Sequence, residues 1–398
     1  MPPARLPLKG VLSLALPSAE QDLLLRSALW PPERARQSLL AWQAKTPHPT
    51  AALARHPGGG RHLAPHIGRV IAGDAGGLDG RLLTYLRTAA VREAARGDEF
   101  RRIYANVLLA LTEAEVPVLP VLGAALSELF YPDPRLRHSA AIDLLLRVED
   151  IPRAAGIVER IGFRAADERG PDRIRHQVHE SGLPLVLHRG LFRYRHYNLP
   201  QTEMWERAES REILGTAVKV LIPEDQLFHV CVHAMTGGHR ADLLWVCDAW
   251  LVLERTPEID WDLVGATAVR AHAVLPLAIT LNYLARAMEA PIPGRVVERL
   301  QTAAANQPRF TLDLALLGAW TGAGSKIVPS LRRAESWRDR ATVIRWRLAP
   351  SPEALLSAAR ITSKWEYPFF CLARPVRLAA RGARWLVGGD ARPPRTPA

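Results

Sequence analysis

Cysteine is scarce in this chain, and its three copies, Cys231, Cys247 and Cys371, lie far apart. No pair has the short spacing of a zinc-binding or redox motif, and three thiols cannot all pair within one chain. The pattern therefore argues against a disulfide framework and predicts reduced, mostly buried thiols. Such thiols are typical of a cytoplasmic protein, which is the location we expect.

Long apolar runs are missing as well. The longest candidate, residues 273–288, is interrupted by Pro276, Asn282 and Arg286, whereas a membrane span needs about 18 or more mainly apolar residues. Residues 1–19 weakly resemble a signal peptide, but the apolar run is short and Pro17 closes it. We expect neither a transmembrane segment nor a signal peptide.

Lysine is rare too: only five of the 52 basic residues are Lys, and the formal net charge is +12. An arginine-rich chain fits either a GC-rich coding sequence or an anionic partner, because guanidinium groups pair with phosphate and carboxylate through two parallel hydrogen bonds. Net charge bears on association and not on the fold. The hydrophobic and charged fractions, 48% and 23%, are ordinary for a globular protein.

The order of the sequence patterns predicts the organisation of the chain, whose 398 residues exceed one typical domain. We expect a helical region over residues 1–95, a compact domain over 96–224, a helical domain over 225–345 and a basic tail over 346–398. The predicted fold class is α+β, with a small mixed sheet flanked by helices and followed by a helical bundle.

The basic tail contains a candidate interaction surface. Arginines three or four residues apart would lie on one face of an amphipathic helix, opposite apolar residues: Arg374, Arg377, Arg381 and Arg384. Such a face could contact an anionic membrane surface, nucleic acid or an acidic protein partner. A terminal helix packed on the bundle with its arginines in solvent would show the same pattern.

The central region carries the clearest local signals. Residues 98–116 place apolar side chains at the spacing of one buried helix face, and Pro117 ends this helix. A short buried strand should then break at Gly123 into another helix. Further strands are expected at 142–146, 183–190 and 217–223. In the first of these, Asp143 is a single carboxylate among apolar residues.

Several weak motifs follow one another in an informative order. They are LGAAL at 122–126, YPDPRLR at 131–137, AAIDLLL at 140–146, LVLHRG at 185–190, EDQLFHVCVH at 224–233 and LLWVCDAWLVL at 243–253. Their order and spacing, over roughly half of the chain, resemble a large bacterial family known as uncharacterised nucleotidyltransferases. The resemblance implies a nucleotidyltransferase-like domain and transfer of a nucleotidyl group from a nucleoside triphosphate.

The resemblance also implies a site. In that fold, two Asp residues one position apart on a strand and a third carboxylate from a neighbouring strand share Mg²⁺ or Mn²⁺, which bridges the triphosphate. Asp143 matches the second Asp and is the expected catalytic and metal-binding residue. The other two carboxylate positions are Ala141 and Val186, and the family's lysine before the glycine is Leu122. Asp143 then resembles the remnant of a metal site, unless Glu128, Asp133, Glu180 or His188 substitutes for a lost ligand.

Residues around Asp143 complete the expected nucleotide site. A glycine followed by a small residue lets backbone N–H groups approach phosphate, so Gly123 and Ala124 are the candidate phosphate-binding turn. Arg135 and Arg137 would lie at the cleft mouth and hold a phosphate or an acidic peptide. A solvent-exposed turn is the alternative for both arginines.

Three further residues are candidates for a role near the cleft. His188 ends the strand after Val186 and would line the cleft. His233 and Asp248 match the family's bundle histidine and aspartate, and we expect a hydrogen bond between them. His229 and His233 also have the four-residue helical spacing of a metal-binding pair, although pairing of His233 with Asp248 is favoured.

The sequence therefore predicts a nucleotidyltransferase-family protein that is catalytically impaired and acts by binding a nucleotide, a peptide or a partner protein in a bacterial biosynthetic pathway. One alternative is an active metal-dependent enzyme with a rearranged site. Another is a non-enzymatic module that binds an anionic partner through the Arg-rich surface.

Overall fold

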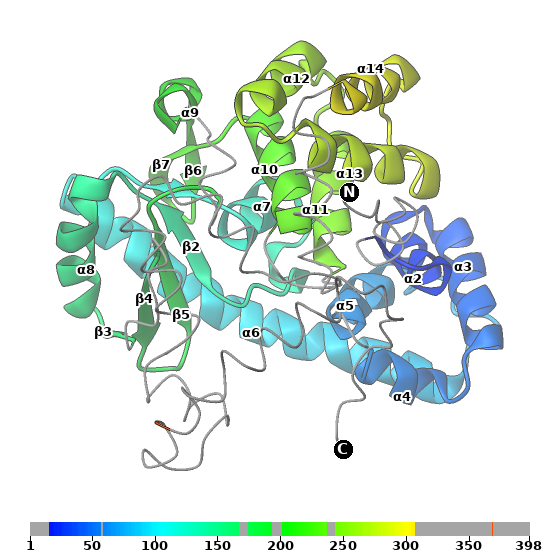
Figure 1. Cartoon of the computed structure of the whole chain (residues 1–398). Helices are drawn as coiled ribbons and strands as arrows, with labels where there is room; N and C mark the ends of the chain where they lie inside the picture. The colour runs from blue at the N-terminus through cyan, green and yellow to red at the C-terminus, as the bar shows by residue number, and fades with distance from the viewer. Residues whose placement is uncertain are drawn as a thin grey trace. The chain divides into compact units, whose positions relative to one another are not determined.

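The computed structural model describes residues 16–56, 59–166, 174–192, 201–236 and 243–306, together with Pro368. Apart from Pro368, all of these residues belong to one compact unit of the chain (Figure 1). The basic face at Arg374, Arg377, Arg381 and Arg384 and the third cysteine, Cys371, lie outside the described residues. Cys231 and Cys247 are buried and reduced, as the sequence predicted.

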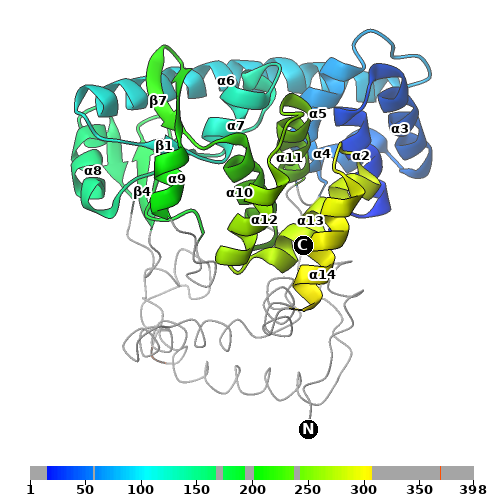
Figure 2. The same ribbon diagram turned by 90° about the horizontal axis from the view of Figure 1, so that it is seen from above.

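Four helices precede the sheet region: α2 (Ala19–Leu29), α3 (Pro32–Lys45), α4 (Pro49–Ala54) and α5 (Gly60–Val70). The long helix α6 (Gly80–Glu113) follows, and Figure 2 shows it extending from α5 to α8. Sequence spacing placed a helix over residues 98–116, but α6 starts much earlier, with Asp79 accepting a capping hydrogen bond from the Leu82 N–H. Helix α6 therefore passes through residue 95, where we expected one region to end.

The central sheet has five strands: β1 (Leu119–Pro120), β2 (Ile142–Leu145), β3 (Phe163–Ala165), β4 (Ile174–His179) and β5 (Pro184–His188). Their order is β1-β2-β5-β4-β3. Only the pairing of β2 with β5 is parallel, so the sheet is mixed. The strand predicted at 217–223 is β7 (Thr216–Val220), which forms a separate hairpin with β6 (Glu209–Ile213). The predicted α+β fold class is confirmed.

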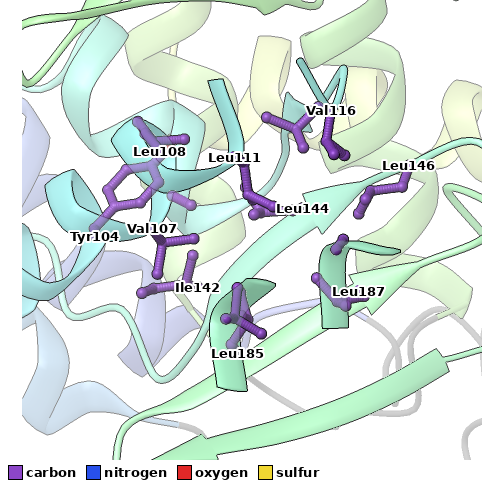
Figure 3. Close-up of a cluster of buried hydrophobic side chains, with 14 of the residues drawn as sticks. Tyr104, Val107, Leu108, Leu111, Val116, Ile142, Leu144, Leu146, Leu185 and Leu187 are labelled. Atoms are coloured by element: carbon purple, nitrogen blue, oxygen red, sulfur yellow. The ribbon is translucent and has the colours of Figure 1, made fainter. Parts of the chain in front are cut away.

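The sheet core lies between β2, β5 and one face of α6 (Figure 3). Tyr104, Val107 and Leu108 of α6 pack against Ile142 and Leu144 of β2. This is the helix face that the spacing of apolar residues predicted. Because side chains alternate along a strand, burial of Ile142 and Leu144 on this face turns Asp143 toward the other face of the sheet.

Shorter elements connect the strands: α7 (Gly123–Phe130), the 3₁₀ turns η1 (Pro134–Leu136) and η2 (Val148–Asp150), α8 (Ile151–Glu159) and α9 (Gln201–Arg207). The helical bundle comprises α10 (Pro223–Thr236), α11 (Leu244–Arg255), α12 (Trp261–Arg270), α13 (Val274–Ala287) and α14 (Gly294–Ala305). Arg26 of α2 donates two hydrogen bonds to the Ala287 carbonyl at the end of α13, which joins the first helices to the bundle. Within the described part of the chain, no helix is both long and apolar enough to cross a membrane.

Candidate functional site

Asp143 is hydrogen-bonded to a histidine from the neighbouring strand. The His188 Nε2–H donates to the Asp143 carboxylate oxygen Oδ1 over 2.7 Å. The parallel pairing of β2 with β5 sets Asp143 opposite Val186 and Leu145 opposite His188, so all four side chains lie on the face away from the α6 core. The Asp143 and His188 side chains are 16% and 14% exposed, so both remain partly accessible to solvent.

The same register locates the residues that replace the expected carboxylates. Val186 is the direct cross-strand neighbour of Asp143 and is 7% exposed. Ala141 lies two residues before Asp143 and is half-buried. Neither side chain can ligate a cation, and within the described residues no three His, Cys, Asp or Glu side chains are grouped to hold a metal ion. Among the described side chains, this donor set does not fit the expected pair of divalent cations.

Two of the four groups considered as substitutes for the missing ligands are occupied by arginines. Glu128 accepts hydrogen bonds of 2.9 and 3.2 Å from Arg101, and Asp133 accepts from Arg135 over 2.9 to 3.1 Å. The group that contacts Asp143 is His188. The position of His188 at the end of a predicted strand was therefore enough to make it a candidate from the sequence. Its contact with Asp143, however, depends on the β2–β5 register.

The glycine turn before α7 has an unusual backbone. Leu122, at the position where the resemblance implies a lysine, has φ +52° and ψ −135°, a region that costs a non-glycine residue about 1–3 kcal/mol. Gly123 and Ala124 follow as the first residues of α7, and both are buried. Strain of this kind is typical of functional sites, and the turn is where the resemblance predicts phosphate binding.

Gly123 leaves room for the Arg137 guanidinium, which packs against it. A Cβ at position 123 would overlap Nη1 of Arg137 and would lie 2.8 Å from the Ser139 hydroxyl oxygen. Nη1 of Arg137 itself donates to the Ser139 hydroxyl over 3.2 Å and to the His138 carbonyl over 3.0 Å. Because glycine has no side chain, the Arg137 guanidinium approaches the turn more closely than any other residue at position 123 would allow.

Arg137 is buried and paired, whereas the sequence predicted a position at the cleft mouth. Its Nε and Nη2 donate to the two Asp248 carboxylate oxygens over 3.1 and 2.7 Å, and the side chains are only 10% and 6% exposed. The Tyr131 hydroxyl donates to the same carboxylate over 2.6 Å. Burial, together with the Asp248 charge, raises the pKa of Tyr131 well above its usual value, which keeps the hydroxyl a proton donor.

Asp248 accepts hydrogen bonds from Tyr131 and Arg137. The hydrogen bond that we expected from His233 stays a prediction. The ring of His233 lies against that of His229, with centroids 5.7 Å apart. Tyr131 belongs to the YPDPRLR motif and Asp248 to the LLWVCDAWLVL motif. The presence of both motifs in one chain could therefore have suggested that these two residues meet.

Arg135 lies in a different environment from Arg137. It is partly exposed and pairs with Asp133 over 2.9 Å, and its Nη1 lies 3.8 Å from Asp98 of α6. The hydrogen bond from Arg135 is the main cause that lowers the pKa of Asp133. Arg135 is thus a surface arginine within an acidic turn, and its predicted contact with phosphate stays a prediction.

His229 of α10 contacts the chain just after β5, the strand that His188 ends. Its Nε2–H donates to the Leu191 carbonyl over 3.1 Å, just beyond the end of β5. Burial lowers the pKa of His229 well below 6.5, and the charges of His233 and His188 add to this effect. His229 is therefore neutral, and its Nδ1 is a buried acceptor without a hydrogen-bond partner among the described residues.

The fold and the site define a protein of the nucleotidyltransferase type, with a small mixed sheet, a strained glycine turn and an aspartate on the inner strand β2. The family model for uncharacterised nucleotidyltransferases matches residues 61–289, more than half of the chain. The chain belongs to this family. No curated protein and no solved structure matches it.

Proposed function

We propose that this protein binds a nucleotide through its phosphates on the sheet face that carries Asp143, and that it is impaired in metal-dependent nucleotidyl transfer. The observation that carries this proposal is the environment of Asp143. Val186 lies directly across from it, and His188 donates a hydrogen bond to its carboxylate. Two-metal transfer needs several oxygen ligands around the reacting phosphate, and one engaged carboxylate does not supply them.

Binding is supported by the features of the fold that are retained. The turn before α7 keeps Gly123 and Ala124 at a helix start, where backbone N–H groups and the helix dipole favour an anion. Leu122, which stands where the resemblance implies a lysine, has a strained backbone just before this helix start. If divalent cations bind, Asp143 is the residue that would hold them, and they would neutralise phosphate charge.

Calorimetric titration of ATP, GTP, CTP and UTP tests the proposal, with EDTA or with Mn²⁺, on the wild type and on Asp143→Asn. We expect binding in EDTA, little further gain from Mn²⁺, and no pyrophosphate release. Tight binding that requires Mn²⁺ and disappears in Asp143→Asn, accompanied by pyrophosphate release, would instead identify an active enzyme with a rearranged metal site. Absence of binding of any nucleotide would overturn the proposal.

A further inference from the structure

The segment from the end of α4 to the middle of α6 carries a group of exposed arginines. Residues 55–92 contain six arginines, no lysine, no glutamate and only two aspartates. None of the six forms an ion pair with a carboxylate in the described part of the chain: Arg55, Arg61, Arg69, Arg81, Arg87 and Arg92. The two aspartates are engaged elsewhere, since Asp74 pairs with Arg36 over 2.9 Å and Asp79 caps the start of α6. The described carboxylates therefore leave the positive charge of this surface unneutralised.

Two of these arginines lie in line on α6 with a tyrosine between them. Arg81, Tyr85 and Arg92 follow the three-four spacing of one helix side, and the row is about 16 Å long at 1.5 Å per residue. Both arginines are exposed, and Tyr85 is partly exposed. The row therefore presents two guanidinium groups and one aromatic ring to solvent along a single line.

Helix α5 adds a third guanidinium to this row. The two helices pack closely, because a Cβ at Gly68 of α5 would lie only 2.9 Å from the Leu86 carbonyl oxygen of α6 (Figures 1 and 2). Burial raises the pKa of Tyr85, and the positive charges of Arg92 and Arg61 lower it again, since both guanidinium groups lie near the hydroxyl. Arg61, at the start of α5, thus flanks the row that Arg92 belongs to.

The acidic residue next to Arg92 is already neutralised. Glu93 accepts a hydrogen bond from Arg96 over 2.8 Å and lies 3.1 Å from Nδ1 of His138. The His138 ring stacks on His62, with centroids 4.0 Å apart, and Arg61 donates from Nε to Nε2 of His62 over 3.2 Å. These contacts hold Arg61 in place and leave no unpaired carboxylate beside it among the described residues.

A line of guanidinium groups with an aromatic ring between them suits a strand of nucleic acid. Guanidinium groups pair with phosphate through two hydrogen bonds, and aromatic side chains stack on bases of any sequence. At about 3.4 Å per phosphate of a stacked strand, a 16 Å row spans about five nucleotides.

A membrane surface or an acidic protein would require apolar anchors beside the arginines. Among the described side chains of residues 55–92, only Val91 is a large apolar group that is mostly exposed. It lies about 100° around α6 from Arg92, outside the row. The surface therefore offers charge and one aromatic ring but no apolar patch.

We propose that the basic row, formed by Arg61, Arg81 and Arg92 with Tyr85, binds the backbone of a single-stranded nucleic acid. The arginines contact phosphates along the strand, and the Tyr85 ring stacks on a base. This inference goes beyond the proposed function and is independent of it, because the basic row belongs to α5 and α6 and not to the sheet face that carries Asp143.

Fluorescence anisotropy of the full chain with a labelled oligouridylate of about 20 nucleotides tests the inference. At about 50 mM NaCl we expect a dissociation constant on the order of micromolar. Arg61→Glu/Arg92→Glu should weaken binding by roughly 10- to 100-fold. Arg61→Ala and Arg92→Ala should each lower the slope of log affinity against log salt concentration by about 0.7, because each removes one phosphate contact with a single strand. A slope that stays unchanged in both variants would overturn the inference.

The matched control is Arg255→Glu/Arg295→Glu, the same change of charge at exposed positions of α11 and α14. It should bind like the wild type, and an equal loss of affinity would show that only net charge matters and overturn the inference. A loss confined to the tail variant Arg377→Glu/Arg381→Glu would overturn it as well. Equal or tighter binding of polyglutamate would identify an acidic protein partner instead, and equal or tighter binding of vesicles containing phosphatidylserine would identify a membrane. Absence of oligouridylate binding would overturn the inference and leave the nucleotide site untouched.

Discussion

Arg137 and Asp248 form a buried, two-point ion pair that joins the glycine turn to the helical bundle. Nη2 and Nε of the arginine donate to separate carboxylate oxygens, and Nη1 of the same guanidinium packs against Gly123. The pair therefore couples α11, which carries Asp248, to the first residue of α7. It explains why two weak motifs about 110 residues apart occur together in this chain.

Breaking this pair from one side should be costly. Asp248→Ala leaves a buried guanidinium without its counter-charge and removes the acceptor of the Tyr131 hydroxyl, so the free energy of unfolding should fall by about 3–5 kcal/mol. Urea denaturation of Asp248→Ala, of Arg137→Leu and of the double variant measures the coupling. We expect the double variant to lose less than the sum of the single losses. Additive losses would show that the pair contributes no coupling energy.

Gly123→Ala should damage the turn although alanine is the better helix former. The added Cβ would overlap the Arg137 guanidinium, which is held in place by Asp248, Ser139 and the His138 carbonyl. We expect a destabilisation of about 1–3 kcal/mol, the usual cost of overpacking. The matched control is Gly156→Ala in α8, where nothing lies within 4 Å of the new Cβ. It should be stabilising by about 0.5–1 kcal/mol, and equal behaviour of the two variants in thermal melts would refute the packing argument.

Restoring the missing carboxylates should restore a metal site. In Ala141→Asp/Val186→Asp, two new carboxylates join Asp143 on one sheet face, and adjacent strands lie only about 4.8 Å apart. We expect Mn²⁺ binding, measured by electron paramagnetic resonance, to become tight in this variant and to be lost again when Asp143→Asn is added. Ala141→Asn/Val186→Asn is the uncharged control. If the restored variant folds and binds Mn²⁺ no better than this control, Asp143 does not lie in a metal-site geometry.

Acid should destabilise the protein through buried histidines beside α6. Burial lowers the pKa of His62 and of His66 to about 4, from 6.5; the charge of His138 adds to the effect on His62, and that of Arg69 to the effect on His66. Between pH 6.5 and 4 the unfolded chain binds more protons, so the free energy of unfolding falls as the pH drops. If His62 and His66 each took up one full proton on unfolding, the free energy of unfolding would change by about 2.7 kcal/mol per pH unit. We expect a smaller slope, because His62 remains partly solvated.

Glu93 extends this acid sensitivity to lower pH. Burial alone would raise its pKa, but hydrogen bonds from His138 and Arg96 lower it to about 2, so its stabilising contribution is lost as the pH falls from 4.5 toward 2. Chemical denaturation between pH 4 and 8 tests the histidine part of the prediction. The variant His66→Gln should reduce the slope, because Gln does not titrate. An unchanged slope in this variant would show that His66 is not the source.

The sequence predicted helices and strands well where the spacing of apolar residues matches the face that is buried in the structure. The apolar spacing over residues 98–116 identified the face of α6 that packs on the sheet, and the strand around Asp143 was located to within one residue. The start of α6 was missed because its N-terminal half buries only three apolar residues, Leu82, Leu86 and Ala89, which keep helical spacing but form a sparser apolar face than that of residues 98–116. Strand β1 has only two residues and depends on its pairing with β2.

The candidate site was predicted as a set of residues and not as an arrangement. The motifs brought Gly123, Arg137, Asp143, His188 and Asp248 to attention, and all five lie in the described part of the chain. Arg137 was expected at an open cleft and is instead buried against Asp248, because the guanidinium fills the space that Gly123 leaves. No local pattern records which of several carboxylates a buried arginine will meet.

What the sequence by itself determined is the family, the α+β class and the presence of Ala141 and Val186 where the resemblance implies carboxylates, since each of these depends on residue identity and spacing along the chain. Only the tertiary structure decided that Val186 faces Asp143, that His188 donates to it, and that Arg137 belongs to Asp248. The physical reason is that strand register and helix packing are set by which whole faces of strands and helices become buried. Residues distant in sequence compete for places on these faces, so spacing along the chain does not show which side chains meet.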